Sequence, residues 1–284
     1  MHLLISVIIP VYNPILETFE QTLNSVLRQT WNNLEILVID DGSDIDIYPT
    51  IKNTNDHRIF YDKIEHSNAN VARNHGIKKS KGNFIAMLDA DDIWLENHLE
   101  DCYNTISKNE VDGLYGSLFI GAINNPFIVR PLKNSETMID YLLSTGFGAQ
   151  TSTLFLSQLS AKSVIWDTSL NRHQDYDFVI RYSKKYTIIP KNNPTVIYSL
   201  TNKALSIDFN SCIRFICDNR NDISSHLYYR YSIKMLQLAK RQKANSKIIS
   251  YYIKEIIKYT KYTSFDLYIK LLQPKTKIKK FTVK

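Results

Sequence analysis

The sequence is poor in the residues that mark linkers, disulfide frameworks and zinc sites. It has only 8 glycines and 8 prolines among 284 residues, which is too few for a linker-rich or disordered chain. Its three cysteines, Cys102, Cys212 and Cys217, cannot form a disulfide framework in a chain of this length and lack partners at zinc-finger spacing. The sequence therefore indicates a globular protein in a reducing compartment, which we expect to be the cytoplasm.

Long apolar segments are absent as well. The longest apolar run, residues 3–12, already contains Ser6 and Pro10, whereas a helix needs about 20 apolar residues to cross a bilayer. The first residues have neither the basic segment nor the small-residue cleavage site of a signal peptide. We therefore expect no membrane-spanning segment.

Charge is distributed unevenly along the chain. The net charge is +7, but residues 228–284 carry 15 basic and 2 acidic side chains, whereas residues 1–227 carry 20 basic and 26 acidic ones. A basic end on an acidic body is expected where one end docks on an anionic surface. No nucleic-acid-binding motif accompanies the basic residues, so we expect no nucleic-acid partner.

One basic segment near the end of the chain also has a helical apolar stripe. The stripe consists of Ile248, Ile249, Tyr252, Ile253, Ile256 and Ile257, and Lys247, Lys254, Lys258 and Lys261 fall elsewhere around the helix. This pattern is typical of a helix lying on an anionic membrane surface. It fits equally well a helix packed on the domain or on a second copy of the chain, as in a homodimer.

Apolar segments of strand length alternate with helical patterns in the first half of the chain. Strands are predicted at 3–11, 34–39, 58–61 and 84–88, and helices at 18–29, 70–79 and 95–107. Such alternation predicts an α/β fold, with a mostly parallel sheet flanked by helices.

The pattern becomes less regular after Val111. Short strands are predicted at 114–120, 127–129, 153–156, 187–189 and 196–200, with helices near 136–143 and 176–184. We interpret residues 1–205 as one domain with halves of about 1–110 and 111–205. We expect residues 206–284 to be a helical, Lys/Tyr/Ile-rich and basic C-terminal region.

Polar side chains follow three of the predicted strands where each strand ends. These are Tyr12 and Asn13, then Asp40 and Asp41, then Asp89, Asp91 and Asp92. Any one set is explained by turn formation alone. Because ligands of open α/β sheets bind beyond the carboxyl ends of the strands, three sets at one edge indicate a ligand site.

The residue types in these sets suit a nucleotide and a divalent cation. Carboxylates such as Asp91 can hold Mg²⁺ or Mn²⁺, which a departing diphosphate requires. The acid at Asp40 can accept hydrogen bonds from a uracil N–H or a ribose hydroxyl. Arg73 can clamp phosphate or stack on a base. The alternatives are a helix cap at Asp92, an Asp-Gly turn and a surface ion pair of Arg73.

Four segments in order carry a resemblance to a known family. They are residues 6–13 (SVIIPVYN), 38–43 (VIDDGS), 72–74 (ARN) and 88–92 (LDADD). Together they resemble the family 2 glycosyltransferases with the Rossmann-like GT-A fold, over about residues 1–200. The resemblance implies a nucleotide-sugar half, an acceptor half and inverting transfer of a sugar.

The resemblance also implies roles for individual residues. Tyr12 would stack near the nucleobase, Asp40 would bind uracil, Arg73 would lie near the nucleotide, Asp89 would lie near the ribose and Asp91 would bind Mn²⁺ or Mg²⁺. Pro10, Asp41 and Ala90 complete the expected nucleotide-sugar-binding set.

A catalytic base is expected in the segment 173–177 (HQDYD). The resemblance implies Asp175, preceded by Gln174 where the family more often has Glu, with Asp177 and His173 as secondary candidates. A base is also required chemically, because an acceptor hydroxyl must lose its proton as it attacks. The alternative for both acids is compensation of charge at a helix N-terminus.

The expected function is metal-dependent transfer of a single sugar, most simply from a UDP-sugar, to a glycan or lipid-linked glycan in capsule, lipopolysaccharide or exopolysaccharide assembly. Single-sugar addition is expected because the Gln-x-x-Arg-Trp motif of processive synthases and their transmembrane helices are absent. We expect a cytoplasmic protein, peripheral on the inner face of the membrane. Trp94 and Trp166 are interpreted either as sugar platforms or as core residues.

Two other functions remain open at this stage. A sugar nucleotidyltransferase would need a glycine-rich phosphate loop, and residues 10–14 (PVYNP) contain no glycine. A non-catalytic membrane-surface protein on the same scaffold has no evident use for Asp40, Asp91 and Asp175 together.

Overall fold

The structure is a computed structural model that describes residues 3–200 and 206–259. It divides into two compact units, Met1–Leu205 and Ser206–Lys284. The first unit contains two β-sheets and the helices that cover them, and the described part of the second unit is helical.

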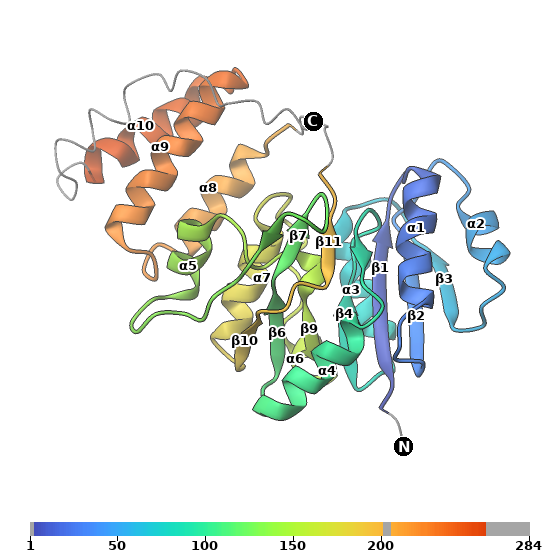
Figure 1. The fold of residues 1–284 in the computed structure, drawn as a ribbon. Helices are drawn as coiled ribbons and strands as arrows, with labels where there is room; N and C mark the ends of the chain where they lie inside the picture. The colour runs from blue at the N-terminus through green and yellow to red at the C-terminus, as the bar shows by residue number, and fades with distance from the viewer. Residues whose placement is uncertain (1–2, 201–205, 260–284) are drawn as a thin grey trace. The chain divides into compact units, whose positions relative to one another are not determined.

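A seven-stranded sheet forms the centre of the first unit (Figure 1). Its strand order is β10-β6-β9-β4-β1-β2-β3. Neighbours are parallel except on both sides of β9, which runs antiparallel to β4 and β6. The predicted mostly parallel sheet is therefore confirmed. The strands are β1 (Ile5–Val11), β2 (Leu34–Asp40), β3 (Ile59–Lys63), β4 (Phe84–Met87), β6 (Gly113–Gly116), β9 (Phe155–Ser157) and β10 (Ile188–Lys191).

A smaller second sheet was not expected from the sequence. It has the order β5-β11-β7-β8 and consists of β5 (Ile93–Trp94), β7 (Leu118–Ile120), β8 (Pro126–Phe127) and β11 (Val196–Tyr198). The strand predicted at 114–120 is interrupted at Ser117, whose N–H donates to the Lys191 carbonyl and whose hydroxyl accepts from the Val129 N–H. The interruption lets one segment serve both sheets.

Helices cover both faces of the large sheet (Figure 1). α1 and α4 pack on one face and α3 lies on the other, against β1 and beside α6. The helices of this unit are α1 (Leu16–Leu27), α2 (Tyr48–Asn53), α3 (Ala69–Lys79), α4 (His98–Asn109), α5 (Met138–Thr145), α6 (Gln158–Ser163) and α7 (Gln174–Ser183), with the 3₁₀ turn η1 (Thr151–Thr153). This layering confirms the expected GT-A architecture.

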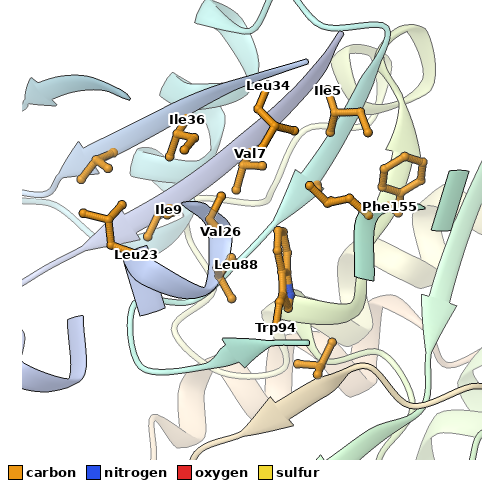
Figure 2. Packing of buried hydrophobic residues seen from close by; sticks show 14 of the residues in the cluster. Ile5, Val7, Ile9, Leu23, Val26, Leu34, Ile36, Leu88, Trp94 and Phe155 are labelled. Atoms are coloured by element: carbon orange, nitrogen blue, oxygen red, sulfur yellow. The ribbon is translucent and has the colours of Figure 1, made fainter. Parts of the chain in front are cut away.

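The hydrophobic core forms because successive side chains of a strand point to opposite faces of the sheet. Ile5, Val7 and Ile9 of β1 point to the α1 face, where they meet Leu23 and Val26 (Figure 2). Each fully buried aliphatic side chain contributes about 1.5–3 kcal/mol. Both candidate sugar platforms belong to the interior: Trp94 and Trp166 are 2% and 1% exposed. The core reading of these two tryptophans is therefore the correct one.

The second unit consists, among its described residues, of α8 (Phe209–Asp218), α9 (Ser225–Arg241) and α10 (Ser246–Tyr259). The apolar stripe of α10 is divided. Ile248 and Tyr252 are buried, and α10 packs on α9, whereas Ile253 and Ile257 are 40% and 69% exposed. Lys261 and the basic residues after it lie outside the described part. Within that part, no helix combines the length and the apolarity that a membrane crossing requires.

Gly76 sets how closely α3 approaches β1. A Cβ at this position would lie 2.5 Å from Cγ2 of Ile8. We expect Gly76→Ala to lower the free energy of unfolding by about 1–3 kcal/mol, because overpacking outweighs the gain in helix propensity of about 1 kcal/mol. Urea unfolding checks this, with the exposed Lys78→Ala on the same helix as the control. A Gly76→Ala protein as stable as the parent would contradict the close contact.

Candidate active site

The carboxyl ends of β2, β1 and β4 meet at one edge of the large sheet. Val11, the last residue of β1, is in register with Asp40, the last residue of β2. On the other side of β1, the Leu88 N–H donates to the Ile8 carbonyl just after β4 ends. The three polar sets found in the sequence therefore lie at the same edge. Pro10 is a buried residue of β1, and the Ala90 carbonyl accepts from the Thr22 hydroxyl.

Asp40 is fully buried, and both of its carboxylate oxygens accept hydrogen bonds from other residues of the protein. Oδ1 accepts from the Ser43 N–H at 2.8 Å, and Oδ2 accepts from the Tyr61 hydroxyl at 2.8 Å. Lys63 Nζ lies 3.9 Å from the same Oδ2 and donates to the Ser43 carbonyl. The side chain expected to bind uracil thus shapes the turn after β2.

The next acid, Asp41, holds the loop that precedes α3. Its carboxylate accepts from the Ser67 N–H at 3.0 Å and lies 3.0 Å from Nδ1 of His66. Gly42 has φ +74°, and a Cβ there would lie 2.7 Å from the His66 backbone nitrogen. The turn therefore requires glycine for both its conformation and its packing.

His66 also forms the support of Tyr12. The two rings stack with centroids 4.1 Å apart and an angle of 15°. Tyr12 remains 47% exposed at the sheet edge, so one ring face is supported while the side chain stays accessible. Nothing in the local sequence indicated His66, because a lone histidine in a loop carries no pattern.

Arg73 connects segments that are far apart in the chain. It is 5% exposed, and its guanidinium lies 4.6 Å from the centre of the Trp166 ring. It donates to Asp89 Oδ1 at 2.7 Å and to Gln174 Oε1 at 3.2 Å. Arg73 therefore joins the turn after β4 to the first residue of α7.

Asp175 follows Gln174 in the first turn of α7. Desolvation raises the pKa of the Asp175 carboxyl to about 6, and the negative charge of Asp89 adds to this shift while Arg73 opposes it. Asp177 is instead 8% exposed and ion-paired to Arg181 at 2.6 Å, one helical turn along. His173 precedes the helix with φ 60° and its ring lies 5.6 Å from that of Tyr176.

Two serines fix the turn Asp89–Asp92, and neither was indicated by the sequence patterns. The Ser152 hydroxyl accepts from the Asp89 N–H at 3.0 Å and donates to Asp92 Oδ2 at 2.5 Å. The Ser199 N–H donates to Asp92 Oδ1 at 2.8 Å, and its hydroxyl donates to the Asp91 carbonyl. Asp92 is 1% exposed, and burial raises the pKa of its carboxyl well above the usual value.

Asp91 differs from its two neighbouring acids in having no such partner. No described residue other than Asp91 itself hydrogen-bonds or ion-pairs with its carboxylate. Desolvation and the charge of Asp89 raise the pKa of Asp91. Among the described residues, no group of three or more His, Cys, Asp or Glu side chains is arranged to hold a metal. One carboxylate plus substrate phosphates and water is nevertheless a normal Mg²⁺ site, so the donor set fits such an ion.

Comparison with known proteins decides the family. The family model "Glycosyl transferase family 2" matches residues 6–163. The chain belongs to glycosyl transferase family 2. This family 2 chain is therefore a glycosyltransferase, as the four motif segments predicted.

Two curated relatives give the range of similarity. The transferase is 28% identical over 261 residues to the amylovoran biosynthesis glycosyltransferase AmsB of Erwinia amylovora, covering 85% of each chain. It is 40% identical over 154 residues to the UDP-Glc:alpha-D-GlcNAc-diphosphoundecaprenol beta-1,3-glucosyltransferase WfgD of Escherichia coli. That match covers 53% of this chain and 60% of WfgD.

Solved structures share the fold of this glycosyltransferase at low identity. S. aureus TarS 1-349 in complex with UDP-GlcNAc has a TM-score of 0.60 at 15% identity, covering 93% of this chain and 75% of that one. The mannosyltransferase PcManGT from Pyrobaculum calidifontis, in complex with GDP-Man and Mn²⁺, has a TM-score of 0.54 at 13% identity, covering 94% and 78%.

Asp92 is expected to stabilise the turn that carries Asp91. In Asp92→Asn only the amide oxygen can accept a hydrogen bond. Either the Ser152 hydroxyl or the Ser199 N–H, which both donate to Asp92, therefore loses its acceptor in the buried turn. We expect the free energy of unfolding to fall by about 1–3 kcal/mol, measured by urea unfolding. Glu20→Gln, an exposed acid-to-amide change, is the control and should fall within about 0.5 kcal/mol of the parent. An unchanged midpoint for Asp92→Asn would contradict the assigned hydrogen bonds.

Proposed function

We propose that the protein transfers a single sugar, with inversion and with a divalent metal, from a UDP-sugar to a hydroxyl of a lipid-linked glycan during assembly of a bacterial surface polysaccharide. Residues 1–205 would form the transferase domain. The observation that carries the proposal is the bridge from Arg73 to Asp89 and Gln174. Through it the acids at the end of β4 and Asp175 on α7 share one edge of the sheet.

The relatives support the donor and the acceptor class. TarS was crystallised with UDP and with UDP-GlcNAc. WfgD is named for transfer of glucose from UDP-Glc to a GlcNAc-diphosphoundecaprenol lipid, and AmsB for biosynthesis of the polysaccharide amylovoran. A UDP-sugar and a diphosphate-linked lipid glycan are therefore the first substrates to test on this chain.

Asp91 is the proposed metal-binding residue. Of the three acids in the turn, Asp89 is paired with Arg73 and Asp92 is buried against two serines, which leaves Asp91 uncompensated. A bound Mn²⁺ or Mg²⁺ would neutralise charge that develops on the departing diphosphate. PcManGT, which was solved in complex with GDP-Man and Mn²⁺, supports the proposal of a metal on this fold.

The nucleotide would lie over the ends of β1 and β2. Tyr12 offers an exposed ring supported by His66, as stacking on a nucleobase requires. Asp40 and Asp41 hold the turn and the loop around this ring, so we assign them positioning roles in nucleotide binding. Arg73 likewise acts through Asp89 and Gln174.

Asp175 is the proposed base. It accepts the proton of the acceptor hydroxyl as that oxygen bonds to the anomeric carbon of the donor, while the bond from this carbon to the diphosphate breaks. One such displacement inverts the anomeric centre. A carboxyl with a pKa of about 6 is ionised at neutral pH and basic enough to take a proton. Asp177 is less suited, because its charge is already paired with Arg181.

Metal-dependent nucleotide binding tests the donor half of the proposal. We expect UDP to bind at least tenfold more tightly with Mn²⁺ than without it, and Asp91→Asn to remove this difference. Isothermal titration with UDP in Mn²⁺ and in EDTA measures it. Glu20→Gln serves as the surface control. Equal affinities in Mn²⁺ and EDTA for the parent protein would refute the metal assignment.

The pH dependence of transfer tests the base. Because Asp175 must be ionised to accept a proton, we expect kcat/KM to decrease as the pH falls through about 6, rather than near the ordinary aspartate value of 3.8. Asp175→Asn should reduce transfer by at least about 100-fold, within the usual range for loss of a general base. It should bind UDP as the parent does.

The assay is UDP release at fixed metal across a pH series. The matched control is Asp177→Asn, which also removes an acid from the first turn of α7. Full activity in Asp175→Asn would exclude it as the base.

A further inference from the structure

The side chain of Tyr198 has no role in the proposed chemistry, yet it lies beside the acids. It is the last residue of β11, directly before Ser199, which hydrogen-bonds Asp92 and the Asp91 carbonyl. Burial raises the pKa of Tyr198, and so do the negative charges of the surrounding acids, in the order Asp92, Asp89, Asp175 and Asp91. A phenol hydroxyl is protonated at neutral pH in any case and can donate a hydrogen bond.

The hydroxyl of Tyr198 is also available. No described residue hydrogen-bonds to it, and it is not sealed from solvent. The buried hydroxyl of Tyr182, by contrast, donates to the Asp112 carbonyl at 2.8 Å. The Tyr198 hydroxyl, a hydrogen-bond donor beside the candidate base and metal-binding residues, is therefore able to bind a substrate.

Two phenylalanine rings lie next to Tyr198 in succession. The ring of Phe147 meets that of Tyr198 edge to face, with centroids 6.1 Å apart, and the ring of Phe127 lies 5.4 Å from Phe147. They come from three separate segments: β11, the loop after α5 and β8. All three side chains are only half-buried, unlike the fully buried rings of the core.

We propose that Tyr198, Phe147 and Phe127 form the subsite for the acceptor sugar. The Tyr198 hydroxyl donates to a hydroxyl of the sugar ring, and the two phenylalanine rings pack against its apolar C–H face. This inference rests on the proposed glycosyl transfer, and it names the ligand of this part of the site as a pyranose. The donor nucleotide lies apart from these rings, over β1 and β2.

The test measures binding, so that it does not depend on turnover. Octyl glycosides of glucose, galactose and N-acetylglucosamine are titrated by saturation-transfer NMR into the protein saturated with UDP and Mn²⁺. We expect at least one glycoside to bind. Its Kd should rise about 2- to 12-fold in Tyr198→Phe, as loss of one neutral hydrogen bond predicts. A similar rise is expected in Phe147→Leu, which removes an aromatic contact.

The controls separate recognition from folding. Tyr186→Phe removes the hydroxyl of another half-buried tyrosine, and Phe60→Leu replaces another accessible ring; neither should change the Kd of the glycoside. UDP affinity should stay within about twofold in all four variants. An unchanged glycoside Kd in both Tyr198→Phe and Phe147→Leu, or no binding by any glycoside while UDP binds, would overturn the inference. Failure of the parent protein to bind UDP would instead refute the proposed function.

Discussion

The arrangement of the acids at the carboxyl edge of the large sheet depends on the buried guanidinium of Arg73. Its plane lies over Trp166, and its nitrogens reach Asn70, Asp89 and Gln174, which belong to three separate stretches of chain. A buried charge that loses its partner typically costs 3–5 kcal/mol. Desolvation of two buried charges offsets much of their attraction, so the contribution of this ion pair is mainly to geometry. It holds the turn after β4 and the start of α7 in one arrangement.

The close contact of Gly76 with Ile8 serves the same constraint. Arg73 lies on α3 one turn before Gly76, and this glycine lets the helix approach β1 closely. A displaced helix would move the guanidinium relative to both Asp89 and Gln174. The packing of α3 on β1 therefore affects how Arg73 holds Asp89 and Gln174 at the edge of the sheet.

The large sheet could be predicted from the sequence because its signals are local. β1, β2 and β4 are mostly apolar segments of strand length, and α1 and α4 have a periodic apolar stripe. The small sheet could not be predicted from the sequence. Its strand β5 has only two residues, and these pair with Val196 and Ile197, which lie about a hundred positions further along the chain. Nothing within Ile93 and Trp94 specifies a strand. Their pairing depends on long-range contacts that a window of sequence does not contain.

The same distinction applies to the site. The ionised groups were evident as motifs, but their partners were not: Ser152, Ser199 and His66 come from segments with no pattern of their own. Asp40 is an example: the sequence predicted a strand-end acid that binds uracil, but not the hydrogen bonds that this acid accepts from Ser43 and Tyr61. The ion-pair partner of Asp177 could have been predicted from the sequence. Arg181 stands four residues after Asp177, the spacing of an ion pair on a helix.

The acids of the site can be ordered by what already neutralises them. Asp40, Asp92 and Asp177 are 0%, 1% and 8% exposed and have protein partners for their carboxylates, so they carry structure. Among the described residues, Asp91 and Asp175 have no ion-paired side chain of opposite charge, and desolvation raises the pKa of each. An uncompensated carboxylate is costly in a folded protein unless a ligand compensates it. The two acids that folding leaves unpaired are therefore the ones to which we assign the cation and the proton.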